Sequence, residues 1–158
     1  MPVVESSAVV PVDPASAFAI SQTTGPTRLR WDPFIRRQHF LDGATAPATG
    51  VRTFTRHTSG MTMVSEYVSY APPSNVGMRM VTGPWFFTNL AGGWRFKAVD
   101  GGTQATWKYS FGCRPAWLAP LAERIGTWVL QRDIDRRIAG FARGCADPHV
   151  LAVVRPAA

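Results

Sequence analysis

The chain has 158 residues, of which 46% are hydrophobic and only 17% charged, so it is long and apolar enough for one domain with a sizeable core, and global disorder is excluded. Its net charge of +7 comes from dispersed basic residues with no long run and no zinc-finger spacing, which argues against nucleic-acid binding. An anionic ligand or a membrane surface would use the same charge. Six Trp, nine Phe and three Tyr exceed the usual need of one core, so we expect some of them to line a cavity.

The chain carries no signal for secretion or for a membrane span. Its first basic residue is Arg28, so the opening residues lack the basic segment of a secretory signal. No apolar run approaches the roughly 18 residues of a membrane-spanning helix. We therefore expect a cytoplasmic protein in which Cys113 and Cys145 are free and buried.

The N-terminal region predicts one strand and two short helices. Residues 3–12 are mostly Val, Ala and Ser and are typical of a strand. Asp13-Pro14 predicts a helix start, because Asp caps well and Pro is tolerated at the first helical position. Thr27 is expected to cap a second short helix that ends at Trp31, since the following Asp32-Pro33 disfavours helix.

The middle of the chain, from Arg36 to Gly112, follows a period of two between turn signals and predicts about six strands. The clearest strand is 103–113, where Trp107, Tyr109 and Phe111 alternate with polar residues. Such alternation predicts an antiparallel sheet with one apolar face.

After Pro115 the apolar spacing becomes helical and predicts one helix of about 28 residues that ends near Gly144. Its apolar residues fall on two opposite faces, which a kink at Gly126 or a second buried contact would reconcile. No other element is long enough to cover the sheet, so the sheet is expected to curl around this helix. Residues 147–158 are expected to be a loosely ordered tail beyond a single domain of residues 1–146.

This order of elements, together with four short segments, resembles a known family. The segments are Val10-Pro11-Val12-Asp13-Pro14-Ala15-Ser16-Ala17-Phe18, Trp31-Asp32-Pro33-Phe34, Gly50-Val51-Arg52 and Tyr70-Ala71-Pro72-Pro73. Over residues 3–145 the chain resembles the SRPBCC or START-like superfamily of polyketide cyclase/dehydrase and lipid-transport proteins. The resemblance implies an α+β helix-grip fold, in which a curved antiparallel sheet of about seven strands surrounds a long C-terminal helix, with two short helices after the first strand.

The resemblance also implies a deep, mainly apolar cavity between sheet and helix, but no universal catalytic motif. The first hypothesis is a protein that binds a lipid, polyketide or similar hydrophobic molecule; the alternative is a polyketide cyclase, aromatase or dehydratase that uses the same cavity, and an interaction protein with an incidental cavity is the third. No cofactor is implied, and the chain is expected to be a monomer or homodimer. The residues expected to contact the ligand are Trp31, Phe34, His57, Met78, Met80, Trp94, Phe96, Trp107, Tyr109, Phe111, Leu121 and Ile125.

Three polar residues are candidates for catalysis. His57 either faces the cavity as an acid or base or stands half in water at a strand end before Ser59-Gly60. Glu66 either points inward beside an Arg or is surface charge, because its strand has no clear inner face. Tyr109 either orients a ligand oxygen or is a core residue bonded to backbone.

Other catalytic and metal-binding patterns are lacking. The three His and two Cys residues have no metal-ligand spacing, so no metal site is expected. There is no Gly-x-Ser-x-Gly, Walker or Gly-x-Gly-x-x-Gly motif. The segment Gly83-Pro84-Trp85-Phe86-Phe87 has three successive aromatic residues and is expected to form an apolar rim or interface patch.

Overall fold

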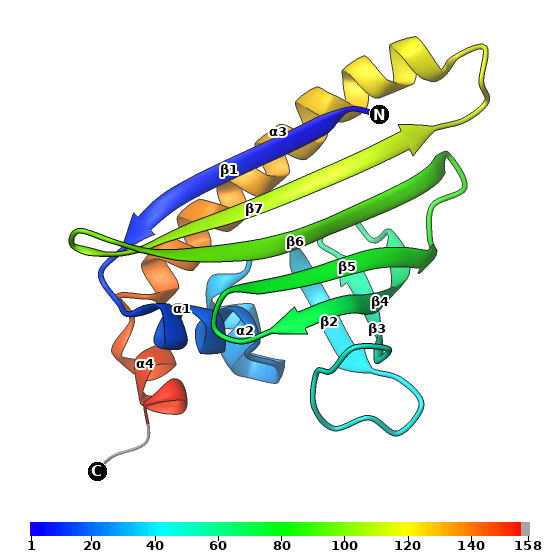
Figure 1. Ribbon diagram of the computed structural model, residues 1–158. Helices are drawn as coiled ribbons and strands as arrows, with labels where there is room; N and C mark the ends of the chain where they lie inside the picture. The colour runs from blue at the N-terminus through cyan, green and yellow to red at the C-terminus, as the bar shows by residue number, and fades with distance from the viewer. Residues whose placement is uncertain (156–158) are drawn as a thin grey trace.

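A seven-stranded antiparallel sheet forms the frame of the molecule in the computed structural model, which describes residues 1–155 (Figure 1). The strands are β1 (Val3–Val10), β2 (Ile35–Phe40), β3 (Arg52–His57), β4 (Thr62–Ala71), β5 (Asn75–Thr82), β6 (Phe87–Val99) and β7 (Gly102–Cys113). Their order across the sheet is β1-β7-β6-β5-β4-β3-β2, so β1 is paired to the last strand and every other pair is sequential. The predicted α+β helix-grip fold, with a curled sheet of seven strands, is confirmed.

The apolar face of the sheet is built by the alternation seen in the sequence. Trp107, Tyr109 and Phe111 on β7 are all buried. Trp94 on β6 lies directly opposite Trp107, and the two rings meet edge to face with their centroids 5.1 Å apart. Edge-to-face contacts of this kind add to the stabilisation that burial alone gives. The two longest strands therefore supply much of the aromatic core.

Within residues 1–155, four helices accompany the sheet: α1 (Pro14–Ser21), α2 (Gly25–Trp31), α3 (Ala119–Gly144) and α4 (Pro148–Val154). Asp13 caps α1 as predicted, its side chain accepting the Ser16 N–H at 3.0 Å. Helix α2 begins at Gly25, two residues before the predicted cap Thr27; the φ of +59° at Gly25 favours glycine. The two short helices after the first strand are thus present, with an earlier start for the second.

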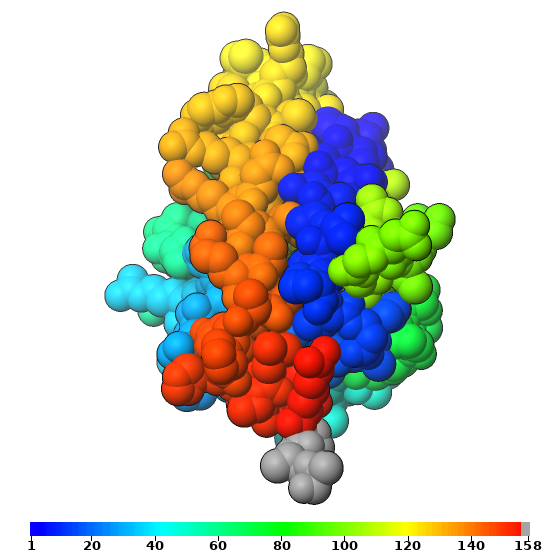
Figure 2. All heavy atoms as spheres, turned by 90° about the vertical axis from the view of Figure 1, so that its left-hand side faces the viewer, coloured from blue at the N-terminus to red at the C-terminus, as the bar shows by residue number. Residues whose placement is uncertain are grey.

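Helix α3 closes the curled sheet. It is 26 residues long and packs along β1 and β7, and Figure 2 shows it running beside β1 on one face of the molecule. Ile134 and Phe141 on its inner side are fully buried. A Cβ added at Gly140 would lie 2.3 Å from the carbonyl oxygen of Trp31, so glycine lets the helix approach the end of α2. The C-terminal part of α3 is therefore held tightly against the core.

The C-terminal segment differs from the loosely ordered tail predicted from residue 147. Residues Pro148–Val154 form α4, which is capped by the Asp147 side chain and anchored by the fully buried Val150. An ion pair between Arg30 and Asp147 also ties it to α2. Pro148 and Pro156, together with the two final alanines, suggest a loose end in the sequence, but Pro148 occupies the first helical turn, where proline is tolerated. Residues 156–158 of the predicted tail lie outside the described residues.

Two further expectations concern the state of the cysteines and the presence of membrane-spanning helices. Cys113 and Cys145 are free and buried, as predicted. Burial raises the pKa of the Cys145 thiol to about 12, so the thiol stays protonated at neutral pH. Within residues 1–155, none of the helices combines the length and apolarity needed to cross a bilayer.

Candidate ligand-binding site

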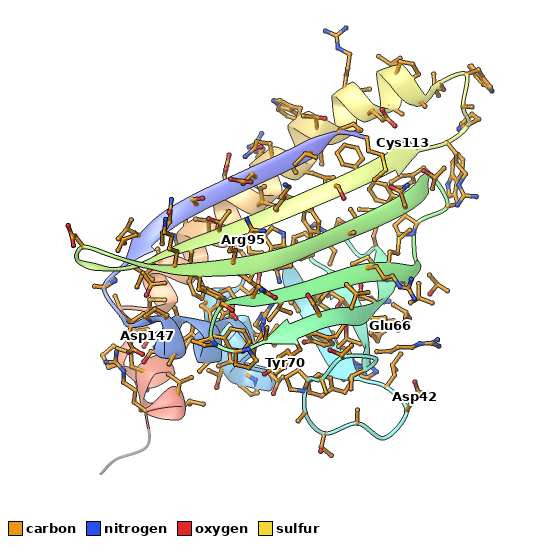
Figure 3. The ribbon with its side chains drawn as sticks, viewed as in Figure 1. Asp42, Glu66, Tyr70, Arg95, Cys113 and Asp147 are labelled. Carbon is orange, nitrogen blue, oxygen red and sulfur yellow. The ribbon has the colours of Figure 1, made fainter. Side chains whose placement is uncertain are left out.

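An apolar pocket of about 380 Å³ lies between the sheet and the N-terminal half of α3; we call it the outer pocket. Cys113, labelled in Figure 3, is one of its residues and stands at the end of β7 that leads toward α3. Strands β3, β4, β6 and β7 supply one wall, and α3 supplies the other. The lining residues are Phe34, Thr55, His57, Met61, Thr62, Met63, Pro84, Phe86, Phe87, Leu90, Tyr109, Cys113, Ala122, Ile125, Gly126, Val129, Leu130 and Asp133.

A smaller chamber of about 50 Å³ lies deeper in the molecule, and we call it the inner chamber. It is more polar, because Arg28, Arg137, Gln22 and several hydroxyl groups line it together with Trp and Met side chains. The two spaces share the lining residues Phe34, Thr55, Met63, Leu90 and Tyr109. They therefore form two compartments of one site, apolar outside and polar within.

Most residues predicted to contact a ligand line one of these compartments. Phe34, His57, Tyr109 and Ile125 line the outer pocket. The inner chamber is lined by Phe34, Tyr109, Met78, Met80, Trp94 and Trp107.

Four of the predicted residues line neither compartment. Trp31 is buried in the core, where its Nε1 donates to the Thr23 Oγ1 at 3.0 Å and its ring packs edge-on against Phe141. Phe96 and Phe111 are also core residues. Leu121 is on the outside of α3 and is 56% exposed. Alternation and helical spacing predict the buried face of an element, but not which of its side chains border a pocket.

His57 lines the outer pocket and also bonds to the turn that follows its strand. Its Nδ1 accepts the backbone N–H of Ser59 at 2.9 Å, and its Nε2 lies 3.2 Å from the Asp133 Oδ2 on α3. Because a backbone N–H can only donate, Nδ1 is the acceptor and the neutral ring carries its proton on Nε2. The ring edge also packs on Phe34, with centroids 4.5 Å apart. The histidine therefore joins β3 to α3 at the wall of the pocket.

Glu66 takes the outward alternative. On β4 its neighbours Ser65 and Tyr67 are buried and line the inner chamber, whereas Glu66 does not. It pairs instead with the exposed Arg79 of the adjacent strand at 3.4 Å. An ion pair of this exposure contributes little to stability, so Glu66 is surface charge.

Tyr109 lies where the two compartments meet. It is buried, and burial raises the pKa of its phenol, so the hydroxyl remains a hydrogen-bond donor at neutral pH. It lines both compartments, so its side chain borders the ligand space as well as the core.

A buried charge cluster of Arg28, Asp32 and Arg137 stands beside the inner chamber; none of these three residues is among the predicted site residues. The Asp32 Oδ2 accepts from the Arg28 Nε at 2.7 Å and from the Arg137 Nε and Nη2 at 3.1 and 2.9 Å. Burial alone would raise the pKa of Asp32, but the two guanidinium groups outweigh it and hold the pKa below its usual value. The i, i+4 spacing of Arg28 and Asp32 was the available signal; the sequence gives no sign of Arg137, 105 residues away.

Exposed aromatic residues stand next to the lining residues of the outer pocket. Trp85 is 71% exposed, whereas its neighbours Pro84, Phe86 and Phe87 line the pocket. On α3, Trp128 is also exposed beside the lining residue Val129. The segment 83–87 is therefore divided between pocket wall and exposed apolar surface.

No set of side chains suited to a metal ion is present among residues 1–155, since no three His, Cys, Asp or Glu residues come together there. The charged groups of the site are the buried cluster, the exposed Arg79 and the His57–Asp133 pair. The arrangement can hold an apolar molecule, orient its oxygen atoms and move a proton at the pocket wall.

Comparisons with known proteins agree with this architecture. The model of the family Polyketide cyclase / dehydrase and lipid transport matches residues 1–145, and the chain belongs to this family. A search of curated proteins finds none that matches the sequence.

Solved structures share the fold at low sequence identity. The protein XoxI from Bacillus cereus has a TM-score of 0.75 at 10% identity, over 94% of this chain and 99% of that chain. Ara h 8.0201 has a TM-score of 0.69 at 16% identity, over 92% and 97% of the two chains. The di-domain ARO/CYC protein BexL from the BE-7585A biosynthetic pathway has a TM-score of 0.69 at 18% identity, over 92% of this chain and 50% of its own. At these identities the likeness concerns the fold alone.

Proposed function

We propose that the protein binds a hydrophobic small molecule in the space between the sheet and α3. The observation that carries this proposal is the apolar outer pocket of about 380 Å³. Its volume lies within the range of roughly 300–1,000 Å³ that is typical of small-molecule sites. Membership of a family described by lipid transport and by polyketide chemistry supports the same class of ligand.

The pocket walls favour an apolar ligand with few polar groups. Side chains such as Met63, Leu90 and Val129 can offer only van der Waals contact, which together with desolvation gives about 25 cal/mol per Å² of buried apolar surface. Thr55 and Tyr109 are placed to bond with an oxygen atom of the ligand. Shape and burial would therefore determine affinity, and the hydroxyl groups would determine orientation.

The test is to fill the pocket from α3. Ala122 lines the outer pocket and Ala139 is exposed on the same helix, so Ala122→Trp and Ala139→Trp make the same chemical change in two environments. With the neutral fluorophore N-phenyl-1-naphthylamine as probe, we expect Ala122→Trp to weaken binding at least about tenfold, the equivalent of roughly 1.4 kcal/mol. Ala139→Trp should bind as the unchanged protein does. Equal binding by both variants, or no binding by the unchanged protein, would contradict the proposal.

The His57–Asp133 pair favours a second candidate, a cyclase, aromatase or dehydratase acting on a polyketide chain. Asp133 lines the pocket and its Oδ2 lies 3.2 Å from the His57 Nε2, so its carboxylate is placed where it can accept a proton from a bound molecule. Tyr109 would donate to a ligand carbonyl as charge develops on it. The test is mass spectrometry of a poly-β-ketone thioester after incubation. Loss of one water that requires Asp133 and His57, with probe binding kept in Asp133→Asn, would select the enzyme; no change in the thioester would exclude it.

A further inference from the structure

The charges beside the inner chamber do not balance. Arg28 and Arg137 share the single carboxylate of Asp32, and their side chains are only 8% and 5% exposed. The other oxygen of Asp32 accepts the backbone N–H of Phe34 at 3.0 Å. Among the described residues that line the chamber there is no Asp and no Glu. One positive charge is therefore buried in excess.

Aromatic rings and backbone carbonyls contact the two guanidinium groups. The guanidinium carbon of Arg137 lies 4.4 Å from the ring centre of Trp107 and 4.8 Å from that of Phe34. Arg28 Nη1 donates to the carbonyl of Ser21. Such contacts lower the cost of a buried cation, but they do not neutralise it.

A second observation also points to a missing acceptor. The Nε1–H of Trp107 is buried and makes no hydrogen bond of normal geometry among the described residues, although Trp107 lines the chamber; the Tyr109 hydroxyl is close enough for only a weak interaction with it. Indole nitrogen is a donor only, so the missing partner is an acceptor. Tyr109 is a further donor on the same wall, because burial keeps its phenol protonated. Excess positive charge and unused donors together suit a small anion.

The size and connection of the chamber limit what that anion can be. A volume of about 50 Å³ has room for one or two water molecules, or for a carboxylate, but not for a large headgroup. Phe34, Met63 and Leu90 line both compartments, so a molecule in the outer pocket can extend into the chamber.

We propose that the inner chamber binds the carboxylate of an amphipathic acid whose hydrocarbon body fills the outer pocket. This rests on the proposed hydrophobic ligand binding and adds the chemical class of the ligand. The bound carboxylate brings the net charge of the cluster to zero, and it accepts hydrogen bonds from Arg137 and Trp107. An uncharged alcohol of the same length fills the outer pocket equally well but leaves the positive charge in place.

The experiment compares dodecanoic acid with 1-dodecanol at pH 7, by displacement of N-phenyl-1-naphthylamine. A charged hydrogen bond contributes about 1.5–3 kcal/mol, so we expect the acid to bind roughly 10- to 100-fold more tightly than the alcohol. Equal binding, or tighter binding of the alcohol, would overturn the carboxylate site and leave the hydrophobic pocket standing. Failure of both compounds to bind would overturn the proposed function and this inference with it.

Variants of two neighbouring arginines on α3 locate the effect. Arg137→Gln removes the excess charge and still leaves Asp32 paired with Arg28, so the preference for the acid should fall to about one. Arg136→Gln is the matched control, because Arg136 is exposed on the same helix and lines neither compartment; its preference should not change. If Arg137→Gln keeps the preference for the acid, or the control variant loses it, the assignment of the carboxylate to the inner chamber would be overturned.

A measurement on the unchanged protein decides the question if Arg137→Gln does not fold. Dodecanoic acid labelled with carbon-13 at its carboxyl group reports its own ionisation through its chemical shift. Beside a buried positive charge the bound carboxyl should titrate at lower pH than in water, whereas burial without the arginines would raise its pKa. A raised value would contradict the proposal.

Discussion

The two halves of helix α3 pack in opposite ways. In the C-terminal half, from Leu130 onward, Ile134 and Phe141 are fully buried against the core. In the N-terminal half the apolar residues Leu121, Ile125 and Trp128 are more than half exposed, and the outer pocket lies beneath the helix. One continuous helix thus joins a densely packed region to one that borders empty space.

This difference explains how the fold keeps a cavity open. A buried void removes van der Waals contacts and destabilises the protein around it. The C-terminal half fixes the position of α3 through close contacts, including that of Gly140 with Trp31 and the ion pair of Arg137 with Asp32. The N-terminal half is held from that anchor and does not need to fill the pocket.

The largest contrast is expected from removing one aromatic ring in each half. Phe141→Ala should lower the free energy of unfolding by about 3–5 kcal/mol, because it leaves a cavity among Trp31, Trp94 and Phe96. Trp128→Ala should cost less than about 1 kcal/mol, since this ring is 65% exposed and contacts mainly Arg132. Urea denaturation monitored by circular dichroism measures both. Similar losses would contradict the division of the helix into two regions.

The next largest loss in the free energy of unfolding is expected when the Asp32 carboxylate, which anchors the C-terminal half of α3, is removed. Asp32→Asn leaves two buried guanidinium groups without a carboxylate, and loss of one partner in a buried pair costs about 3 kcal/mol or somewhat more.

The Asp32 effect has a defined dependence on pH. The folded pKa of Asp32 lies below its unfolded value, so its contribution is complete above the unfolded pKa of about 3.9 and is lost as the pH falls through the folded value. The stability difference between the unchanged protein and Asp32→Asn should therefore be constant from pH 7 to 5 and shrink toward acid. A difference that grows on acidification would contradict this origin.

The sequence predicted the sheet and helix α3 well, because both depend on the spacing of apolar residues and on turn residues between the elements. Alternation around Trp107, Tyr109 and Phe111 gave the inner face of β7, and the apolar spacing after Pro115 gave α3. The same pattern placed Leu121 toward a ligand, because a helical stripe of apolar residues usually covers a core. In the N-terminal half of α3 the apolar residues Leu121, Ile125 and Trp128 remain largely exposed. This exposure follows from the packing of the whole fold and cannot be derived from the spacing alone.

The polar parts of the site were harder to predict, because they depend on contacts between distant segments. Asp133 meets His57 across 76 positions of the chain, and Arg137 meets Asp32 across 105. Asp32 was interpreted as part of a helix stop, which it is, since α2 ends at Trp31. Its second role, as the shared partner of two arginines, follows from tertiary structure alone.

A smaller change in stability is expected from a substitution at Gly140, where α3 lies against the end of α2. Alanine is about 1 kcal/mol better than glycine inside a helix, so Gly140→Ala would stabilise an unconstrained helix. Here the new methyl group would meet the Trp31 carbonyl oxygen and the Pro33 ring, so the helix has to move away and the protein should lose about 1–3 kcal/mol. Thermal denaturation checks the sign. A higher melting temperature would show that the C-terminal half is not as tightly held as its contacts indicate.

The smallest effect is expected from the His57–Asp133 pair, which links β3 to the region where the two halves of α3 meet. The two side chains are 16% and 24% exposed, so their interaction is partly screened by water. A double-mutant cycle with His57→Gln and Asp133→Asn should give a coupling of about 0.2–1 kcal/mol at pH 7. Because so little stability depends on the pair, both variants should fold and bind the neutral probe. A coupling above about 2 kcal/mol would instead make the pair a second anchor, and the N-terminal half of α3 would then be held from both sides of the pocket.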